Sequence, residues 1–458
     1  MLELLCPIKK NALERPLHPA IITDDAIYTY QKLHQKLDEI VNLLKQKGIQ
    51  SRQRVAFHAK LSAQTLFLLF ALSRMQAAAC PISVRLPKEA LPEMLDRLQA
   101  SFYIDIDSLA LTYLEGSSNQ PFFDKSPLFT LLCTSGSTSF AKIVAHSFEN
   151  FYYSALGSNL SLGLQPNHRW LLSLPLNHVG GIALAFRCFL NGAAIVLSHI
   201  PLKESIKLYE VTHLSLVPTQ LYRLVQDLQE TSLPSLDVIL LGGAPIPEEV
   251  FNKALKKGLK IFATYGMTEM SSQITMDDPE SSLKEITSGI PLPFREVKIN
   301  AEGEILVRGK TLFQGYWTSE KKLELPLEDG WFATKDTGHW TEDGKLILKG
   351  RKDNMFISGG ENIYPEVIEK ELCELPGIIQ ALVVPLPDPE FGHRPVALIK
   401  EENTNYTLEE LRENLRKKLP GFCLPIKMLP MPEIPLGELK INRKKLLEHV
   451  VDVVKLST

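Results

Sequence analysis

The sequence has 458 residues, of which 45% are hydrophobic and 22% are charged, and its formal net charge is −3. This length exceeds what one hydrophobic core usually supports, so we expect a globular protein of at least two domains. The small charge argues against nucleic acid or an anionic membrane as a partner. The six scattered cysteines argue against a metal cluster or a disulfide framework and favour a reducing cytoplasm.

The N-terminal third has the pattern of helices alternating with short strands. The first ten residues place their charges after a short apolar run, the reverse of a secretory signal. Apolar residues from Tyr30 to Leu44 recur at steps of three and four, which predicts a helix with Thr29 as its cap and Gly48 as its end. A strand over 55–58 and an apolar helix over about 63–77 follow. The strongest apolar run, 65–72, is too short to span a bilayer.

Further apolar runs are spaced by sequence that is compatible with helices. They lie at residues 193–197, 213–217, 238–241 and 261–263. Short buried strands that alternate with helices predict a parallel sheet with helices on its faces. In such sheets, ligands gather at the loops beyond the carboxyl ends of the strands. We therefore examine three segments that follow apolar runs: 134–142, 242–245 and 265–269.

Residues 134–142 are rich in hydroxyl side chains and end in a lysine. The segment reads Thr134-Ser135-Gly136-Ser137-Thr138-Ser139-Phe140-Ala141-Lys142. Turning amides and hydroxyls are donors to phosphate oxygens, and the lysine adds a mobile charge. The spacing is not that of a Walker A loop. Taken by itself, the segment is compatible with a phosphate-binding loop and with a solvated surface loop.

The pattern changes after about residue 298. Short strands over 297–299, 304–308, 315–317 and 345–348 are separated by Gly, Asn and Asp, which predicts a compact β-rich subdomain. The polar stretch Gly350–Asn354 suits a linker, and a tail with alternating strand and helix patterns follows it. We therefore predict an α/β fold. A large N-terminal domain (1–352) has βα-layered sheets and the β-rich subdomain, and a small, mobile α+β C-terminal domain (353–458) follows.

Five motifs in order carry a resemblance to a known family. They are the hydroxyl-rich loop, Tyr265-Gly-Met-Thr-Glu269, Gly303-Glu-Ile-Leu-Val-Arg-Gly309, Trp331-Phe-Ala-Thr-Lys-Asp336 and Gly350-Arg-Lys-Asp-Asn-Met-Phe-Ile-Ser-Gly-Gly360. Together they resemble the adenylate-forming superfamily of acyl-CoA synthetases, carrier-protein adenylation domains and luciferases. The resemblance covers the chain from Thr29 to Arg443.

The resemblance implies an enzyme that uses ATP, Mg²⁺ and coenzyme A to activate a small carboxylic acid. It places the phosphates on Thr134, Ser135, Gly136, Ser137, Thr138 and Lys142. It makes Glu269 the magnesium ligand and Thr268 a phosphate contact. Asp336 and Arg351 would bind the ribose, and Gly243, Ala244 and Tyr265 would flank the adenine. From the residues alone, Glu269 also suits the start of a helix, and Asp336 also suits a turn.

The tail would supply the catalytic lysine. Pro435-Leu-Gly-Glu-Leu-Lys440-Ile-Asn-Arg443 resembles the terminal lysine element of the superfamily, in which Lys440 would bridge the carboxylate and the α-phosphate. A surface lysine is the alternative, because this tail carries many cations. Asp353 resembles the hinge residue between two domain orientations. Gly359 and Gly360 would lie against the pantetheine arm of coenzyme A.

Two further segments, 174–181 and 216–223, look most like those of aroyl-CoA ligases. An aromatic acid with a second carboxylate needs apolar walls and one cation at the far end of its pocket. Arg223 is the candidate cation, and His178 and Ser272 are additional candidate contacts. The alternatives are a surface arginine on an amphipathic helix and a satisfied core histidine.

The chain departs from the superfamily pattern at several positions. Ser139 stands where Gly is usual, Ala141 where Pro is usual and Lys335 where Gly is usual, and Glu438-Leu439 replaces a small-Gly pair in a shortened segment. Three hypotheses stay open: an aroyl-CoA ligase, a ligase or adenylating enzyme for another acid or a carrier-protein thiol, and a catalytically impaired nucleotide-binding protein.

Overall fold

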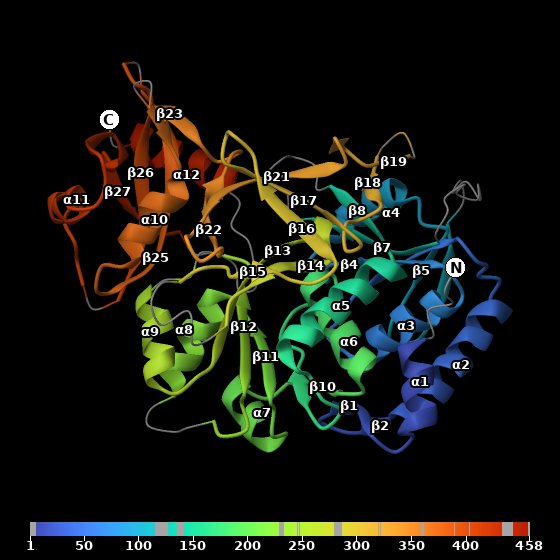
Figure 1. Ribbon diagram of the computed structural model, residues 1–458. Coiled ribbons are helices and arrows are strands. Elements are labelled where there is room, and N and C mark those ends of the chain that lie inside the picture. Colours follow the sequence, from blue (N-terminus) through green and yellow to red (C-terminus); the bar gives the residue numbers. More distant parts are fainter. Residues whose placement is uncertain are drawn as a thin grey trace.

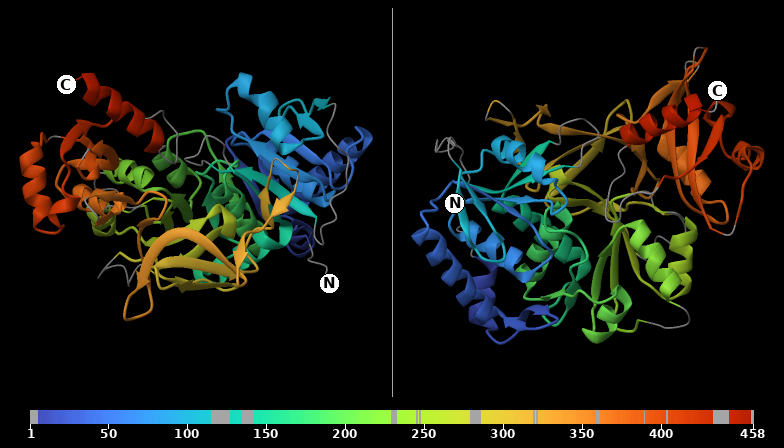
Figure 2. Two further views of the ribbon diagram at one scale, coloured as in Figure 1. Left: turned by 90° about the horizontal axis from the view of Figure 1, so that it is seen from above. Right: turned by 180° about the vertical axis from the view of Figure 1, so that it is seen from behind.

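A computed structural model (Figure 1) describes residues 6–114, 127–134, 142–228, 233–244, 246, 248–278, 286–318, 320, 322–358, 361–388, 390–402, 404–432 and 443–456. A large N-terminal domain contains three sheets, and a smaller C-terminal domain contains a fourth. The C-terminal domain lies at the opposite end of the molecule from helices α1 (Pro7–Glu14) and α2 (Tyr30–Gln46) in all views (Figure 1 and Figure 2). The predicted α/β class is confirmed.

The first sheet has nine strands in the order β15-β14-β13-β12-β11-β9-β10-β1-β2. They are β1 (Pro19–Thr23), β2 (Ile27–Thr29), β9 (Arg169–Leu171), β10 (Ala194–Leu197), β11 (His213–Leu216), β12 (Val238–Gly242), β13 (Ile261–Met267), β14 (Ser272–Met276) and β15 (Ile290–Pro291). The strands from β13 to β1 are parallel, and β2, β14 and β15 add antiparallel edges. The parallel sheet predicted from the apolar runs is therefore present.

The second sheet has eight strands in the order β19-β18-β8-β7-β4-β3-β5-β6. They are β3 (Arg54–His58), β4 (Ala78–Ile82), β5 (Phe102–Ile104), β6 (Leu111–Tyr113), β7 (Leu128–Cys133), β8 (Ile143–Ser147), β18 (Gly315–Trp317) and β19 (Leu323–Glu324). Strand β18 was expected in the β-rich subdomain but pairs with β8, with Tyr316 opposite Val144. The physical reason is the burial of Trp317 in the apolar cluster that contains Leu131 and Ile143.

Three helices lie between these two sheets and share one hydrophobic core with them. They are α3 (Ala63–Arg74), α5 (Phe148–Leu162) and α6 (Val179–Asn191). Phe129 on β7, Phe151 on α5 and Phe186 on α6 form a cluster of rings with centroids 5.3–5.6 Å apart. The remaining helices of the domain are α4 (Leu91–Leu98), α7 (Leu202–Leu208), α8 (Pro218–Asp227) and α9 (Glu248–Lys256).

The chain then forms two smaller sheets. The third contains β16 (Arg295–Ile299), β17 (Glu304–Gly309), β20 (Leu327–Glu328), β21 (Trp331–Trp340) and β22 (Leu346–Arg351). The fourth contains β23 (Phe356–Ser358), β24 (Glu361–Ile363), β25 (Ile378–Asp388), β26 (Gly392–Glu401) and β27 (Lys427–Pro430). Helices α10 (Pro365–Cys373), α11 (Leu408–Arg416) and α12 (Arg443–Leu456) accompany the fourth sheet. This last part has hydrophobic clusters of its own.

The local signals predicted for α2 are confirmed. The Thr29 hydroxyl accepts a hydrogen bond from the Lys32 amide at 3.2 Å, and Gly48 has φ +88° just after the helix. Leu33, Leu37 and the other apolar residues at helical spacing are buried. None of the helices within the described ranges is both long and apolar enough to cross a membrane.

The C-terminal domain contacts α8 and α9 of the large domain. The Tyr222 hydroxyl donates to the Glu402 carboxylate across this contact. A cavity of about 270 Å³ lies beside them, with Val250 and Ile378 among its lining residues. Of the predicted site residues that the structure describes, none lines this cavity.

Candidate active site

The predicted phosphate loop connects two neighbouring antiparallel strands, β7 and β8. At its base, the Thr134 amide donates to the Lys142 carbonyl at 2.8 Å. This bond holds the two ends of the loop together. The Lys142 ammonium lies 4.4 Å from the centre of the Tyr316 ring on β18. The remaining residues predicted for the loop lie outside the described residues: Ser135, Gly136, Ser137 and Thr138, together with Ser139 and Ala141.

The end of β13 and the turn after it carry the second group of predicted residues. Gly266 passes so close to β14 that a Cβ there would lie 2.1 Å from the Ser272 carbonyl oxygen, so only glycine fits. The Thr268 carbonyl accepts a 2.7 Å hydrogen bond from Nε2 of His146, which is fully buried on β8. The turn is thus fixed to the strand that leaves the phosphate loop.

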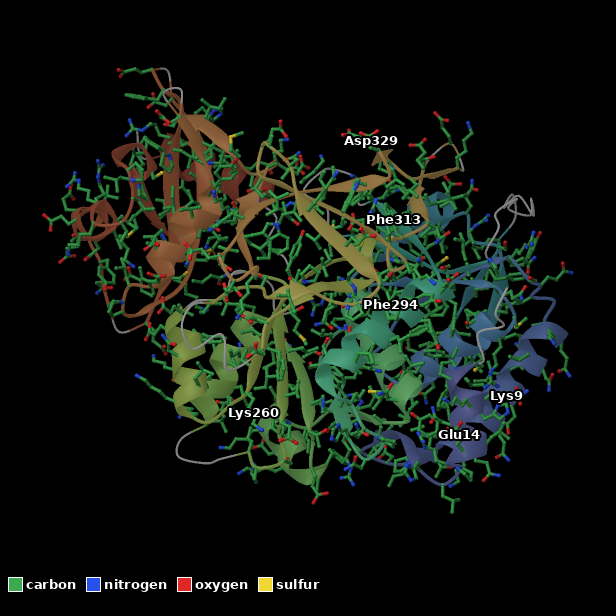
Figure 3. The ribbon with its side chains drawn as sticks, viewed as in Figure 1. Lys9, Glu14, Lys260, Phe294, Phe313 and Asp329 are labelled. Carbon is green, nitrogen blue, oxygen red and sulfur yellow. The ribbon has the colours of Figure 1, made fainter. Side chains whose placement is uncertain are left out.

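Glu269 is held from both its backbone and its side chain. Its carbonyl accepts a 2.8 Å bond from the amide of Phe313, which is labelled in Figure 3. Its Oε1 accepts a 2.8 Å bond from the Tyr316 hydroxyl. Burial and the Glu269 carboxylate raise the pKa of Tyr316, which keeps this phenol a donor. Glu269 and Lys142 thereby contact the same side chain, that of Tyr316.

Asp336 lies on β21, opposite Arg351 on β22. Its Oδ1 accepts from Nη1 of Arg351 at 2.9 Å, and its Oδ2 accepts from the Tyr265 hydroxyl at 2.6 Å. Burial and the Asp336 carboxylate raise the pKa of Tyr265 well above its ordinary value, so the phenol stays protonated. The structure therefore brings together three residues predicted for the nucleoside, from segments separated by more than sixty residues.

Lys335, which stands where the superfamily has glycine, has φ +65°. This left-handed conformation explains the usual glycine, because a side chain there costs about 1–2 kcal/mol. The Lys335 ammonium lies 3.2 Å from Oδ1 of Asp353, and Arg351 lies 3.5 Å from its Oδ2. Asp353, predicted as the hinge residue, thus contacts two cations from the preceding strands.

Two of the residues predicted beside the adenine, Gly243 and Ala244, lie beyond the end of β12. Gly243 has φ +85°, which favours glycine, and both Gly243 and Ala244 are exposed. His178 stands immediately before α6 as its cap residue and is half-buried. Gly243 and Ala244 directly follow the carboxyl end of a parallel strand, where the sequence pattern predicted ligand contacts.

The cation predicted for the acyl pocket, Arg223, is exposed on α8, between the buried residues Leu221 and Leu224. Its role stays a prediction. The structure reveals a second cation, Arg187 on α6, which is 2% exposed and donates to the Ser272 hydroxyl at 3.2 Å. Burial lowers the pKa of Arg187 to about 10.

Arg187 has no carboxylate within ion-pair distance among the described residues, and its Nε has no hydrogen-bond acceptor. The hydroxyl that it contacts belongs to a strained segment, because Ser271 and Ser272 have φ +53° and +106°. Ser272 pairs with Met267, two residues from Glu269. No motif marked Arg187 in the sequence, although it is the only charged residue in the apolar run Val179–Asn191.

The remaining predicted residues, Lys440, Gly359 and Gly360, lie outside the described ranges. Arg443, three residues after Lys440, is described. Its Nη2 donates to Oε2 of the buried Glu369 at 2.7 Å, and its Nη1 donates to the Val383 carbonyl at 2.8 Å. Arg443 therefore fixes the start of α12, three residues after Lys440 in the sequence.

With this fold and this clustering of polar residues, the chain belongs to the AMP-binding enzyme family. Residues 8–317 match the AMP-binding enzyme family, and residues 367–438 match the AMP-binding enzyme C-terminal domain. The superfamily indicated by the five motifs is thereby confirmed.

Among curated proteins, the chain is similar to two 2-succinylbenzoate–CoA ligases. It is 35% identical to that of Escherichia coli (strain K12) over 442 residues, which cover 94% of this chain and 95% of the relative. It is 37% identical to that of Haemophilus influenzae over 434 residues, which cover 93% of each chain.

Among solved structures, the chain is similar to the o-succinylbenzoate CoA synthetase (MenE) of Bacillus subtilis. The complex of that enzyme with the acyl-adenylate intermediate OSB-AMP has a TM-score of 0.86 and 27% identity, and the match covers 96% of this chain and 97% of the other. Its complex with ATP and a magnesium ion also has a TM-score of 0.86, with 96% and 99% covered.

Proposed function

We propose that this protein is an AMP-forming acid–CoA ligase that converts 2-succinylbenzoate, ATP and coenzyme A to 2-succinylbenzoyl-CoA, AMP and pyrophosphate, as a step of menaquinone biosynthesis. The named relatives and structures that match almost the whole chain support this proposal. The observation that carries the choice of acid is the buried guanidinium of Arg187 with no carboxylate partner among the described residues.

The acid has two carboxylates, and only one of them is activated. A buried cation without an anionic partner is costly, and an anionic ligand can offset that cost. Arg187 lies beside Ser272, near the Glu269 turn, and its helix begins next to His178. We assign the second carboxylate to Arg187 and Ser272, with His178 as a further contact. Arg223, which is exposed, is the weaker candidate for this carboxylate.

For the nucleoside, Asp336 would accept the ribose hydroxyls, and Arg351 would hold its carboxylate in place. Tyr265 buttresses the same carboxylate through its hydroxyl while its ring borders the site. Gly243 and Ala244 would line the adenine. The phosphates would lie on the hydroxyl-rich loop and Lys142, with Thr268 as a further contact.

Glu269 would be the protein ligand of Mg²⁺. The described residues contain no group of three or more His, Cys, Asp or Glu that could hold a metal ion by itself. The site fits nevertheless, because Mg²⁺ binds to one or two carboxylates together with substrate phosphates, and Glu269 offers a fixed carboxylate. When bound, the ion would neutralise charge on the phosphates.

In the first half-reaction, a carboxylate oxygen attacks the α-phosphorus, the bond to the β-phosphate oxygen breaks and pyrophosphate leaves. This step gathers anions, so it depends on charge stabilisation and positioning. Lys440 would bring its ammonium to the carboxylate and the α-phosphate. In the second half-reaction, the coenzyme A thiolate attacks the acyl carbon and AMP leaves.

We also propose a division of the chain between residues 352 and 353, with Asp353 at the hinge. The separate hydrophobic clusters of the C-terminal sheet support it. One orientation of the C-terminal domain would present Lys440, and the other would present Gly359 and Gly360 to the pantetheine arm. The scattered cysteines further support a cytoplasmic location, and the small net charge gives no reason to expect a nucleic-acid partner.

ATP–pyrophosphate exchange with a panel of acids tests the proposal. We expect exchange with 2-succinylbenzoate, and a kcat/KM at least ~10²-fold lower with benzoate, because benzoate leaves Arg187 unpaired. Strong exchange with a fatty acid or a simple aryl acid, and none with 2-succinylbenzoate, would overturn the choice of acid. ATP binding without exchange for any acid would indicate an impaired nucleotide-binding protein.

A further inference from the structure

Tyr316 contacts two residues of the proposed ATP site at once. Its hydroxyl donates to Oε1 of Glu269 at 2.8 Å, and the Lys142 ammonium lies 4.4 Å from the centre of its ring. These two charged residues come from segments far apart in the sequence. Strand β18, which pairs with β8, is the element that brings Tyr316 between them.

The tyrosine ring is fixed by its surroundings. Phe313 packs against it edge to face, with the ring centres 4.9 Å apart, and Phe332 packs against Phe313 at 5.2 Å. The backbone of Tyr316 is paired with Val144 on one side and Glu324 on the other. A ring held in this way offers its hydroxyl in one direction and its face in another.

Within the described residues, Lys142 and Glu269 form no direct ion pair, although both contact the same side chain. Such a pair would engage the ammonium that the phosphates need and the carboxylate that the metal needs. The face of an aromatic ring attracts a cation without neutralising it. Tyr316 therefore separates two opposite charges while it holds both near the site.

We propose that Tyr316 is a positioning residue that orients the Glu269 carboxylate for the metal ion and prevents Lys142 from pairing with that carboxylate. The inference rests on the proposed function for ATP and Mg²⁺ but not for the acid. Residues that orient a metal ligand typically change metal affinity or activity by 10–100-fold when they are replaced.

Two substitutions separate the two contacts. Tyr316→Phe removes the bond to Glu269 and keeps the ring under Lys142, whereas Tyr316→Leu removes both. Tyr406→Phe is the matched control, because its hydroxyl donates to the Pro376 carbonyl at 3.0 Å in the C-terminal domain. Circular dichroism and thermal unfolding of each full-length variant check that the fold is kept.

The readout is calorimetric binding of α,β-methylene-ATP, which cannot be cleaved at the reacting bond, with Mg²⁺ or with EDTA. For Tyr316→Phe, we expect affinity to fall about 10-fold with Mg²⁺ and to stay unchanged in EDTA. For Tyr316→Leu, affinity should fall under both conditions, because Lys142 is then free to pair with Glu269. The control should match the wild type under both conditions.

An equal loss for Tyr316→Phe with and without Mg²⁺, or no loss, would overturn the proposal. A double-mutant cycle adds a second test: in a Glu269→Gln background, Tyr316→Phe should have no further effect on Mg²⁺-dependent binding, and additive effects would contradict the assigned coupling. Because this assay contains no acid, the choice of 2-succinylbenzoate can fail while this inference stands.

Discussion

The two domains differ in how the charges of their buried and half-buried arginines are paired. In the large domain, Arg187 and Arg295 are 2% and 5% exposed, and neither has a carboxylate partner among the described residues; burial lowers their pKa values to about 10 and about 9. In the C-terminal domain, Arg443 donates to both carboxylate oxygens of the buried Glu369. Burial opposes the charge of Arg443, but Glu369 and Glu366 more than offset this and raise its pKa.

The difference supports the binding role that we propose for Arg187 and a structural role for Arg443. A buried arginine that is fully paired within the protein stabilises the arrangement around it, and removing it leaves an uncompensated carboxylate. Arg295 donates to backbone carbonyls, including that of Ser154 at 3.2 Å, so much of its donor capacity is used. Arg187 keeps an Nε without an acceptor. Arg187 is therefore the buried arginine that we propose to pair with the substrate.

Replacing Arg187 by Met should have the largest effect of the predicted changes. It should lower the activity without lowering the stability. We expect kcat/KM for 2-succinylbenzoate to fall about 10³-fold, since the loss of one partner of a buried charge pair costs 2–5 kcal/mol or more. The melting temperature should stay unchanged or rise, because the substitution leaves no buried charge at position 187. Steady-state kinetics and thermal unfolding measure both. A 10³-fold loss in Arg223→Met, with little loss in Arg187→Met, would move the assignment to Arg223.

Arg443→Met should do the reverse and act mainly on stability. It leaves the Glu369 carboxylate buried without a cation, with the Val383 amide as its remaining donor, at a cost of about 3–5 kcal/mol. Hydrogen exchange of β25 and α10 amides in the full-length protein reports this loss in the domain concerned. Adding Glu369→Leu should restore most of the protection. If the β25 and α10 amides of the double variant exchange as fast as those of Arg443→Met, the Arg443–Glu369 ion pair is not what stabilises this part of the domain.

The large domain also contains His146, a buried basic side chain that is held in its neutral form. Burial lowers its pKa from 6.5 to about 4, so His146 is neutral when folded. The imidazole binds a proton more readily in the unfolded chain than in the folded one, so acid favours unfolding. The contribution of His146 to the free energy of unfolding is therefore at its full value above pH 6.5 and is lost as the pH falls toward 4. From pH 7 to pH 5, the loss is about 2 kcal/mol for this residue. Denaturant unfolding at both pH values should show a smaller difference in His146→Gln; an unchanged difference would exclude His146 as the cause.

Lys335→Gly lies near the boundary between the large domain and the C-terminal domain. We expect it to have the smallest effect on the free energy of unfolding. Glycine removes the strain of φ +65°, about 1–2 kcal/mol, but adds freedom to the unfolded chain, about 0.5–1 kcal/mol. The exposed contact with Asp353 contributes little. We expect a gain of about 0.5 kcal/mol in the free energy of unfolding. A loss above about 1 kcal/mol would show that the Lys335 side chain matters more than its backbone.

Periodicity located the elements whose apolar pattern is strong. Helix α2 and strands β10 to β13 form close to where the sequence predicts them. The pairing of β18 with β8 was not predictable, because hydrophobic alternation gives the presence of a strand but not its partner. The burial of Trp317 decided that partner.

The same limit applies to the site. Glu269, Asp336 and Arg351 were identified by motif, and the structure adds their partners Tyr316 and Tyr265. Arg187 was not predicted as a site residue, because its apolar neighbours make the segment look like an ordinary helix of the hydrophobic core. A lone charge in such a run is a usable signal, since burying it without a partner is costly.

The pairing of β18 with β8 also affects how the protein folds during synthesis. The two strands are about 170 residues apart in the chain, so β8 leaves the ribosome long before its partner. Until residue 317 has emerged, the strand that follows the phosphate loop exposes an unpaired edge, and such edges promote association between chains. A chain that ends before Gly315 should therefore aggregate, although it contains every residue of the loop.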